Sequence, residues 1–179
     1  MSLLTDVSPS SYAPLDARQG VAALYQRHAL GLVKLAKVML GDQAQAEDIV
    51  QDAFLNLHRK WDSLHDQERA IGYLRASVLN GCRSAHRGRL SFDRALVFFR
   101  RQEDMASAEE SALIGEANRE VITAVRDLPA RQREAVVLRH YLGLSEAETA
   151  AAMGVAPGTV KSATSRGLAA LSRKLKEDK

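Results

Sequence analysis

Residues 145–171, SEAETAAAMGVAPGTVKSATSRGLAAL, carry the signals of two short helices joined by a tight turn. Ser145 followed three residues later by Glu148 is a capping box, which predicts the start of the first helix. Gly154 stands where that helix would end, because glycine readily adopts the left-handed C-cap conformation. A second helix begins near Gly158 after only three or four intervening residues. This spacing predicts a helix-turn-helix unit.

The second of these helices has one apolar and one polar side, which predicts a recognition helix with its polar side exposed. Gly158 adds no side chain, so backbone N–H groups of the first turn could approach a phosphate. The residues expected to face inward are Val160, Thr164, Gly167 or Leu168, Leu171 and Leu175. The candidate DNA-contacting residues are Gly158, Thr159, Lys161, Ser162, Ser165 and Arg166.

The rest of the chain also has a helical pattern. No proline occurs between Leu15 and Leu128, and runs with period-two alternation are missing, which predicts an all-α fold. The first helix should carry an apolar stripe that includes Tyr25 and should end at Gly41, and Asp42 with Gln45 resembles a second capping box. The expected helices span residues 18–40, 68–87, 118–127, 129–142, 146–153 and 158–176, and a further helix opens at Asp42 with its apolar face between Ala46 and Leu57.

Charge divides the chain into parts. The whole has 25 Lys and Arg against 22 Asp and Glu, but residues 1–92 carry +2, residues 93–116 carry −3 and residues 117–179 carry +4. We expect a loose tail over residues 1–17, a helical domain over 18–92, a flexible acidic linker over 93–116 and a small helical domain over 117–179. Within the linker, the apolar patch Leu96–Phe99 is expected to dock on one of the domains.

Several classes of protein are excluded by composition. The single cysteine, Cys82, cannot form an internal disulfide, and no Cys/His spacing is typical of zinc, which favours a reducing cytoplasm. No uncharged apolar run approaches the roughly 20 residues that cross a bilayer, so no membrane insertion is expected. The five histidines are scattered, and no phosphate loop or nucleophile elbow occurs. We therefore expect no catalytic residue, metal, cofactor or small-molecule substrate.

Two acid-free stretches, residues 72–90 and 149–176, indicate two contacts with a polyanion. In the first stretch the basic face of the helix is expected to point outward. Its members are Arg75, Asn80, Arg83, His86 and Arg87.

Trp61 just before this helix could stack on a base, but packing in the core is the better interpretation of a lone aromatic at a helix end.

Four segments in order resemble the extracytoplasmic-function sigma factors of bacterial RNA polymerase. They are LYQRHALGLVKLAKVMLGD, AEDIVQDAFLNLHRKW, GYLRASVLNGCRSAHR and LPARQREAVVLRHYLGLSEAETAAAMGVAPGTVKSATSRGLAAL. The resemblance covers residues 20–90 and 118–176. It implies two domains that bind core RNA polymerase, melt and read the minus-ten element, and read the minus-thirty-five element of promoter DNA.

The resemblance also implies roles for single residues. Asp48, Gln51 and Asp52 match the face that docks on polymerase, and acids grouped on one exposed strip can orient a basic partner. Arg75, Asn80, Arg83, His86 and Arg87 match the minus-ten segment, and residues 158–166 match the minus-thirty-five helix. An anti-sigma factor is a further candidate partner.

Two residues depart from the family pattern, Ala156 where relatives often have serine and Ala163 where they often have arginine. The first removes a hydroxyl cap, at a cost of about 1 kcal/mol, and the second removes one expected DNA contact.

The alternative function is a stand-alone helix-turn-helix regulator whose N-terminal domain is a sensor or dimerisation module. Transcription with core polymerase distinguishes the two.

Overall fold

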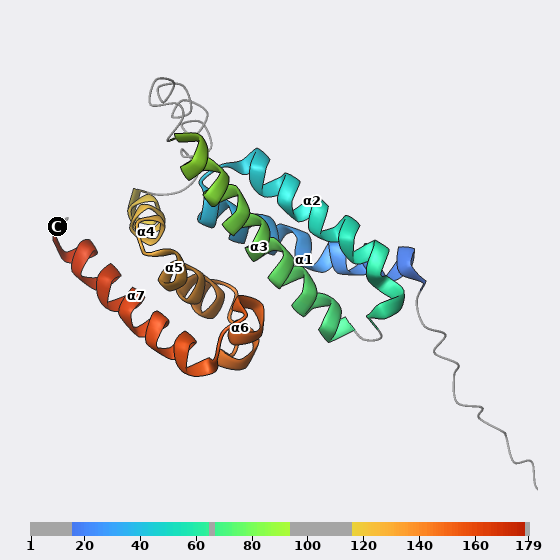
Figure 1. Ribbon diagram of the computed structural model, residues 1–179. Coiled ribbons are helices and arrows are strands. Elements are labelled where there is room, and N and C mark those ends of the chain that lie inside the picture. Colours follow the sequence, from blue (N-terminus) through green and yellow to red (C-terminus); the bar gives the residue numbers. More distant parts are fainter. Residues whose placement is uncertain (1–15, 65–66, 94–115, 178–179) are drawn as a thin grey trace, which may run out of the picture.

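All the regular structure in the described part of the chain is helical (Figure 1). The computed structural model describes residues 16–64, 67–93 and 116–177, and no strand occurs in these ranges. The prediction of an all-α fold is therefore confirmed. The elements are α1 (Ala17–Leu40), α2 (Gln43–Lys60), the 3-10 turn η1 (Trp61–Ser63), α3 (Gln67–Asp93), α4 (Glu116–Arg126), α5 (Ala130–Val136), the π-helical segment η3 (Val137–Tyr141), α6 (Glu146–Met153) and α7 (Pro157–Glu177).

The N-terminal unit is a bundle of α1, α2 and α3, each of which packs against the other two. The turn between α1 and α2 follows the sequence signals, because Gly41 has φ of 82° and its N–H donates to the carbonyl of Lys37. The carboxylate of Asp42 accepts from the backbone N–H of Gln45 at 2.9 Å. The reverse half of the expected capping box is not formed, since the side-chain oxygen of Gln45 has no partner.

The predicted inner faces of these helices form the core of the bundle. Leu35, Leu57 and Leu74, one from each helix, are fully buried. The expectation for Tyr25 was wrong, because this residue is 48% exposed. Phe54 fills the core at that level, and the ring of Tyr25 stands edge-on against it with 5.0 Å between centroids.

Trp61 packs against the core of the N-terminal unit, as the sequence favoured. Its ring lies over α1 at Gly20, where a Cβ would stand only 1.9 Å from the indole. Any larger residue at position 20 would displace the ring, so the glycine is required by this close approach. Trp61 thus closes the end of the bundle where α2 turns toward α3.

The C-terminal unit contains the predicted helix-turn-helix, formed by α6 and α7. Both halves of the Ser145–Glu148 capping box are present, and Gly154 ends α6 with φ of 68°. Gly167 lies against α5, where a Cβ would meet Val136 at 2.7 Å, and Leu168 is 41% exposed. Of the two alternatives for the inward position, the structure therefore selects Gly167.

The helix expected over residues 129–142 is interrupted. Pro129 precedes α5 as its N-cap, and the chain widens into a π-turn from Val137, where the N–H of Leu142 reaches the carbonyl of Val137 at 3.1 Å. The wider turn lets the N–H of Leu144 bond to the carbonyl of Leu138 at 3.0 Å. A periodicity of 3.6 residues cannot reveal such a local change of pitch.

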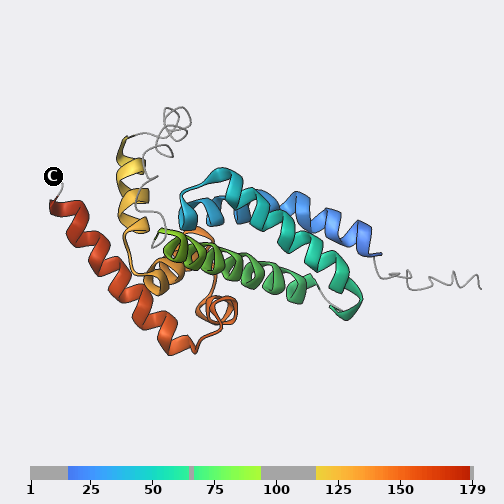
Figure 2. The ribbon, with the colours of Figure 1, turned by 45° about the horizontal axis from the view of Figure 1, so that its top comes forward.

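The two units lie against each other along α3. Figures 1 and 2 show α4 to α7 on one side of α3, with α1 and α2 on its other side. In this contact α6 packs against α3, and α4 packs against α1. The helices of the described ranges include none that is long and apolar enough to cross a membrane.

Candidate nucleic-acid interface

Arg83 of α3 points at the C-terminal unit rather than at solvent. Its Nε donates to Oε1 of Glu134 at 2.8 Å, and its Nη2 donates to Oε2 at 2.6 Å. Nη2 also donates to the backbone carbonyl of Met153 at 3.1 Å, and Nη1 donates to the side chain of Asn80 at the same distance. The pair with Glu134 raises the pKa of Arg83. This guanidinium is therefore the main polar link between the two units.

Glu134 is a buried acid in α5, and its side chain is 2% exposed. A buried carboxylate is tolerated when both oxygens are hydrogen-bonded to a cation, as they are here by Arg83. Arg83 itself keeps 30% exposure, so water still reaches one side of the pair. The stability of this contact therefore depends on both units being in place.

A second ion pair lies farther along α3, where Nη1 of Arg75 donates to Oε1 of Glu148 at 3.1 Å. Glu148 is the same residue that caps α6 by accepting from the N–H of Ser145 at 2.9 Å. The cap bonds with Ser145 and the bond from Arg75 lower the pKa of Glu148. The helix-turn-helix is thus tied to α3 through its own capping residue.

The expectation that the whole basic face of this helix points outward was wrong. Asn80, His86 and Arg87 are exposed, whereas Arg75 and Arg83 are partly buried under the C-terminal unit. The physical reason is the presence of a second domain with acids at matching positions, which helical periodicity within α3 cannot reveal. The structure therefore divides the five candidate minus-ten residues into three exposed and two covered.

Two further arginines of the C-terminal unit hold the end of α1. Nη1 of Arg133 donates to the carbonyl of Met39 at 2.9 Å, and Nη2 of Arg126 donates to the carbonyl of Lys37 at 3.4 Å. The last carbonyls of a helix lack partners within the helix and carry its negative dipole end, so a guanidinium is a suitable donor. Burial lowers the pKa of both arginines.

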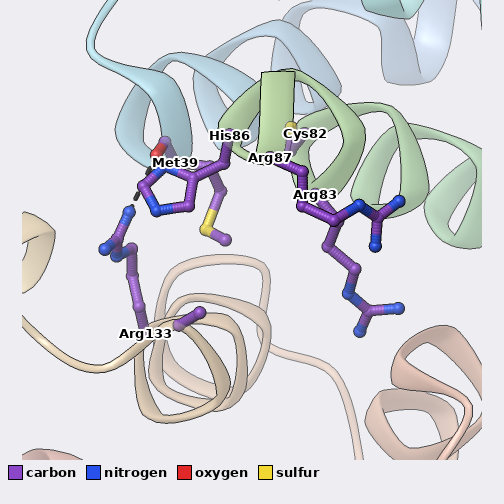
Figure 3. A pocket seen from close by; sticks show the side chains of 7 residues that line it. Met39, Cys82, Arg83, His86, Arg87 and Arg133 are labelled. Carbon is purple, nitrogen blue, oxygen red and sulfur yellow. Dashed lines mark hydrogen bonds between the residues drawn. The ribbon is translucent and has the colours of Figure 1, made fainter. Parts of the chain in front are cut away.

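A surface pocket of about 180 Å³ remains between the two units. Figure 3 shows Met39, Cys82 and Arg133 around it, with the bond from Arg133 to Met39 drawn as a dashed line. Burial raises the pKa of the Cys82 thiol to about 12, so this cysteine stays protonated at neutral pH. The lining of this pocket is therefore rich in arginine.

The acidic strip on α2 is open to solvent. Asp48, Gln51 and Asp52 are exposed, at the i, i+3 and i+4 spacing that places them on one side of the helix. Leu55 extends the same line of residues and is 56% exposed. The three residues expected to meet a protein partner thus form one continuous surface with an apolar end.

The first half of α7 presents the predicted recognition surface. Gly158, Lys161, Ser162, Ser165 and Arg166 are exposed, and Thr159 is half-buried. The hydroxyl of Ser162 donates to the carbonyl of Thr159 at 3.0 Å. Ala163, one of the two departures from the family pattern, is buried, so this position lies on the packed side of the helix. Figure 2 shows α7 on the outer side of the C-terminal unit, away from α1 and α2.

Sequence reasoning missed the residues that join the two units. Arg133 and Glu134 lie in a segment that resembles the family but were given no role, and Arg126 lies just before that segment. The available signal was the position of Glu134 directly before the apolar run Ala135–Leu138, which places an acid on a helix that must be largely buried. An acid in that setting needs a cation from elsewhere in the fold.

Family models and related proteins agree with this geometry. The model "Sigma-70 region 2" matches residues 24–90, and the model "Sigma-70, region 4" matches residues 118–171. The first match contains α2 and most of α3, and the second contains the helix-turn-helix. The two matches therefore coincide with the two helical units.

Individual relatives extend the agreement over most of the chain. It is 32% identical to the RNA polymerase sigma-E factor of Streptomyces coelicolor, over 80% of this chain and 79% of that protein. It is 34% identical to the ECF RNA polymerase sigma factor SigM of Mycobacterium tuberculosis, over 85% and 75% respectively. The sigma factor RpoE of Bartonella quintana, solved in complex with the anti-sigma factor NepR, has a TM-score of 0.65 and 26% identity, covering 88% of this chain and 99% of that one. The chain therefore belongs to the extracytoplasmic-function sigma factors of the sigma-70 family, which direct RNA polymerase to promoters.

Proposed function

We propose that promoter-directed initiation by this sigma factor is divided among three surfaces. They are the acidic strip Asp48, Gln51 and Asp52 on α2, the polar face of α3, and the first half of α7. The observation that carries this division is that α7 and the acidic strip are exposed on separate units, so both can be engaged at once.

The acidic strip is the surface for core RNA polymerase. Carboxylates on one side of a helix steer a basic partner and fix its orientation, and an apolar residue beside them adds contact area. Leu55 supplies such a neighbour.

The face of α3 is the surface for the minus-ten element. Arg75, Arg83 and Arg87 provide guanidinium groups for phosphates, while Asn80 and His86 can pair with base edges or unstacked bases. Melting exposes single strands, and a base held out of the stack costs a few kcal/mol that protein contacts must return.

The exposed side of α7 is the surface for the minus-thirty-five element. Lys161 and Arg166 supply positive charge, and Thr159, Ser162 and Ser165 supply hydroxyl groups at the N-terminal half of the helix, which is the part that a recognition helix places in the major groove. Gly158 opens the first turn for a phosphate. The domains that carry these surfaces correspond to residues 18–92 and 117–179.

An anti-sigma factor is the further partner that we propose, because the similar sigma factor of Bartonella quintana was solved with one. We also propose that the chain works in the cytoplasm, where polymerase and promoter DNA are found, and that it has no catalytic activity of its own. The stand-alone regulator is not favoured, because both sigma family models match the chain.

Run-off transcription with core polymerase tests this division. Mapping of transcript starts after induced expression identifies a promoter for the assay. Asp52→Ala should lower the apparent affinity for core enzyme about tenfold. Glu120→Ala, an equal charge change on an exposed residue of α4, should leave that affinity unchanged. Tight duplex binding by the free chain without added initiation would contradict the sigma mechanism and support the stand-alone regulator.

A further inference from the structure

We propose that the C-terminal unit competes with promoter DNA for α3. In the closed arrangement Glu134 and Glu148 occupy Arg83 and Arg75, and this part of the minus-ten surface becomes available only when the two units separate. The inference rests on the proposed function of α3, and it adds a specific intramolecular competitor to it.

The first argument is the chemical likeness between the competitor and the ligand. The two oxygens of Glu134 accept from Nε and Nη2 of Arg83 in a forked arrangement. Arginine recognises phosphate with this same fork, so a carboxylate and a phosphate compete for one set of donors. Glu134 is thus placed where a backbone phosphate of DNA would bind Arg83.

The second argument is that four of the five N–H donors of Arg83 are already used. A guanidinium has five N–H groups, and the structure assigns four hydrogen bonds to Arg83: two to Glu134, one to Met153 and one to Asn80. A phosphate could not replace these partners while α5 and α6 remain in place. Closure of the units therefore leaves Arg83 with one N–H group, which is too few for the forked contact with a phosphate.

The third argument is that the contact is built to open. Arg133 and Arg126 donate to backbone carbonyls, the Arg75–Glu148 pair is accessible to solvent, and a surface pocket of about 180 Å³ lies between the units. Exposed ion pairs contribute little and are screened by salt, and interfaces between domains of one chain are commonly of the transient kind. Glu134 is the exception, because it is buried and both of its oxygens accept from Arg83.

Single-molecule energy transfer on the full chain measures the closure directly. Dyes are placed at two exposed positions, Asn56→Cys on α2 and Ser172→Cys on α7, in a chain that also carries Cys82→Ala, because Cys82 lines the space between the units and opening would uncover it. Glu134→Gln should raise the ratio of open to closed molecules about tenfold, because the amide carries no charge and keeps only one of the two oxygens that accept from Arg83. Glu146→Gln is the matched control, since it removes an exposed acid from the start of α6 and should leave the ratio unchanged.

A charge swap separates this effect from damage to the fold. Arg83→Glu combined with Glu134→Arg should return the ratio to the closed side, which either single change should not do. If Glu134→Gln remains as closed as the parent chain, or if the swap stays open, the proposed competition is wrong whatever α3 binds.

A second readout distinguishes the closure from the function of α3. Binding of a short single-stranded DNA of mixed sequence, followed by anisotropy, should strengthen up to about tenfold in Glu134→Gln in step with opening. Opening without stronger binding would overturn the competition. Adding Arg83→Ala to Glu134→Gln then tests whether Arg83 binds DNA. Unchanged binding contradicts the proposed role of Arg83, whereas weaker binding leaves that role intact.

Discussion

Helices α3 and α7 share a sequence property but differ in structure. Each contains a long stretch with arginine or lysine and no acid, residues 72–90 in α3 and residues 157–176 in α7. In α3 two of the basic side chains are covered by the other unit, whereas in α7 Lys161 and Arg166 face solvent. A basic helix is therefore not by itself an accessible one.

The cause of this difference is how the packing partners are arranged around each helix, since both helices pack against three others. One side of α7 packs on α5 with Gly167 at the point of approach, and its other side stays free of helices in both views (Figures 1 and 2). Helix α3 is packed on one side by α1 and α2 and on another by α6. The free chain should accordingly engage the minus-thirty-five element more readily than the minus-ten element.

The largest expected effect concerns duplex DNA that carries the minus-thirty-five element. Lys161→Glu combined with Arg166→Glu should weaken binding of the free chain roughly 100-fold at low salt, because two attractive charges become repulsive on an exposed surface. Anisotropy titration measures this. Arg18→Glu combined with Arg59→Glu, an equal charge change at two exposed positions of the N-terminal unit, is the control. An equally large loss in this control would assign the effect to net charge rather than to α7.

The next effect is on stability. Arg83→Ala should lower the free energy of unfolding by about 1–3 kcal/mol, because the buried carboxylate of Glu134 loses both hydrogen bonds from Arg83. Separation of the units limits this loss by letting water reach Glu134. Urea denaturation measures it, with Arg87→Ala as a control that should change stability by less than about 0.5 kcal/mol, since Arg87 is exposed. Equal losses of stability in Arg83→Ala and Arg87→Ala would contradict the conclusion that Arg83 is covered and Arg87 is exposed.

A smaller effect concerns the salt dependence of the same duplex binding. Lys161→Ala should weaken affinity by about tenfold at most and flatten the plot of log affinity against log salt concentration by roughly one counterion. Loss of a phosphate contact changes the slope of this plot, whereas loss of the fold would not depend on salt concentration in this way. An unaltered slope would remove Lys161 from the phosphate contacts.

The smallest effect is a pH dependence at the start of α6. The pKa of Glu148 is lowered in the fold, so its contribution to stability is present above the unfolded value of 4.5 and is lost as pH falls through the lower folded value. Glu148→Gln should therefore differ in stability from the parent chain near pH 7 and converge with it in acid. Ser145→Ala should cost about 1 kcal/mol as a lost cap. Denaturation curves at several pH values measure both, and a constant difference for Glu148→Gln would contradict its role as a charged cap.

The limits of α6 were predictable because their causes are local. Ser145, Glu148 and Gly154 act within a few residues, and the structure places the helix between them as expected. The exposed acids of α2 followed from helical spacing alone in the same way. The π-turn from Val137 did not, because the hydrogen bond from Leu142 to Val137 depends on how the following turn packs.

By itself, the sequence determined the helices, their caps, the inner faces and the family, since these depend on neighbours in the chain or on a pattern spread along it. Only the tertiary structure decided that Arg83 meets Glu134 and that Arg75 meets Glu148. These partners lie 51 and 73 residues apart, and no periodicity within a helix specifies which distant acid will face a given arginine. Access to the basic face of α3 is therefore a property of how the two units pack together.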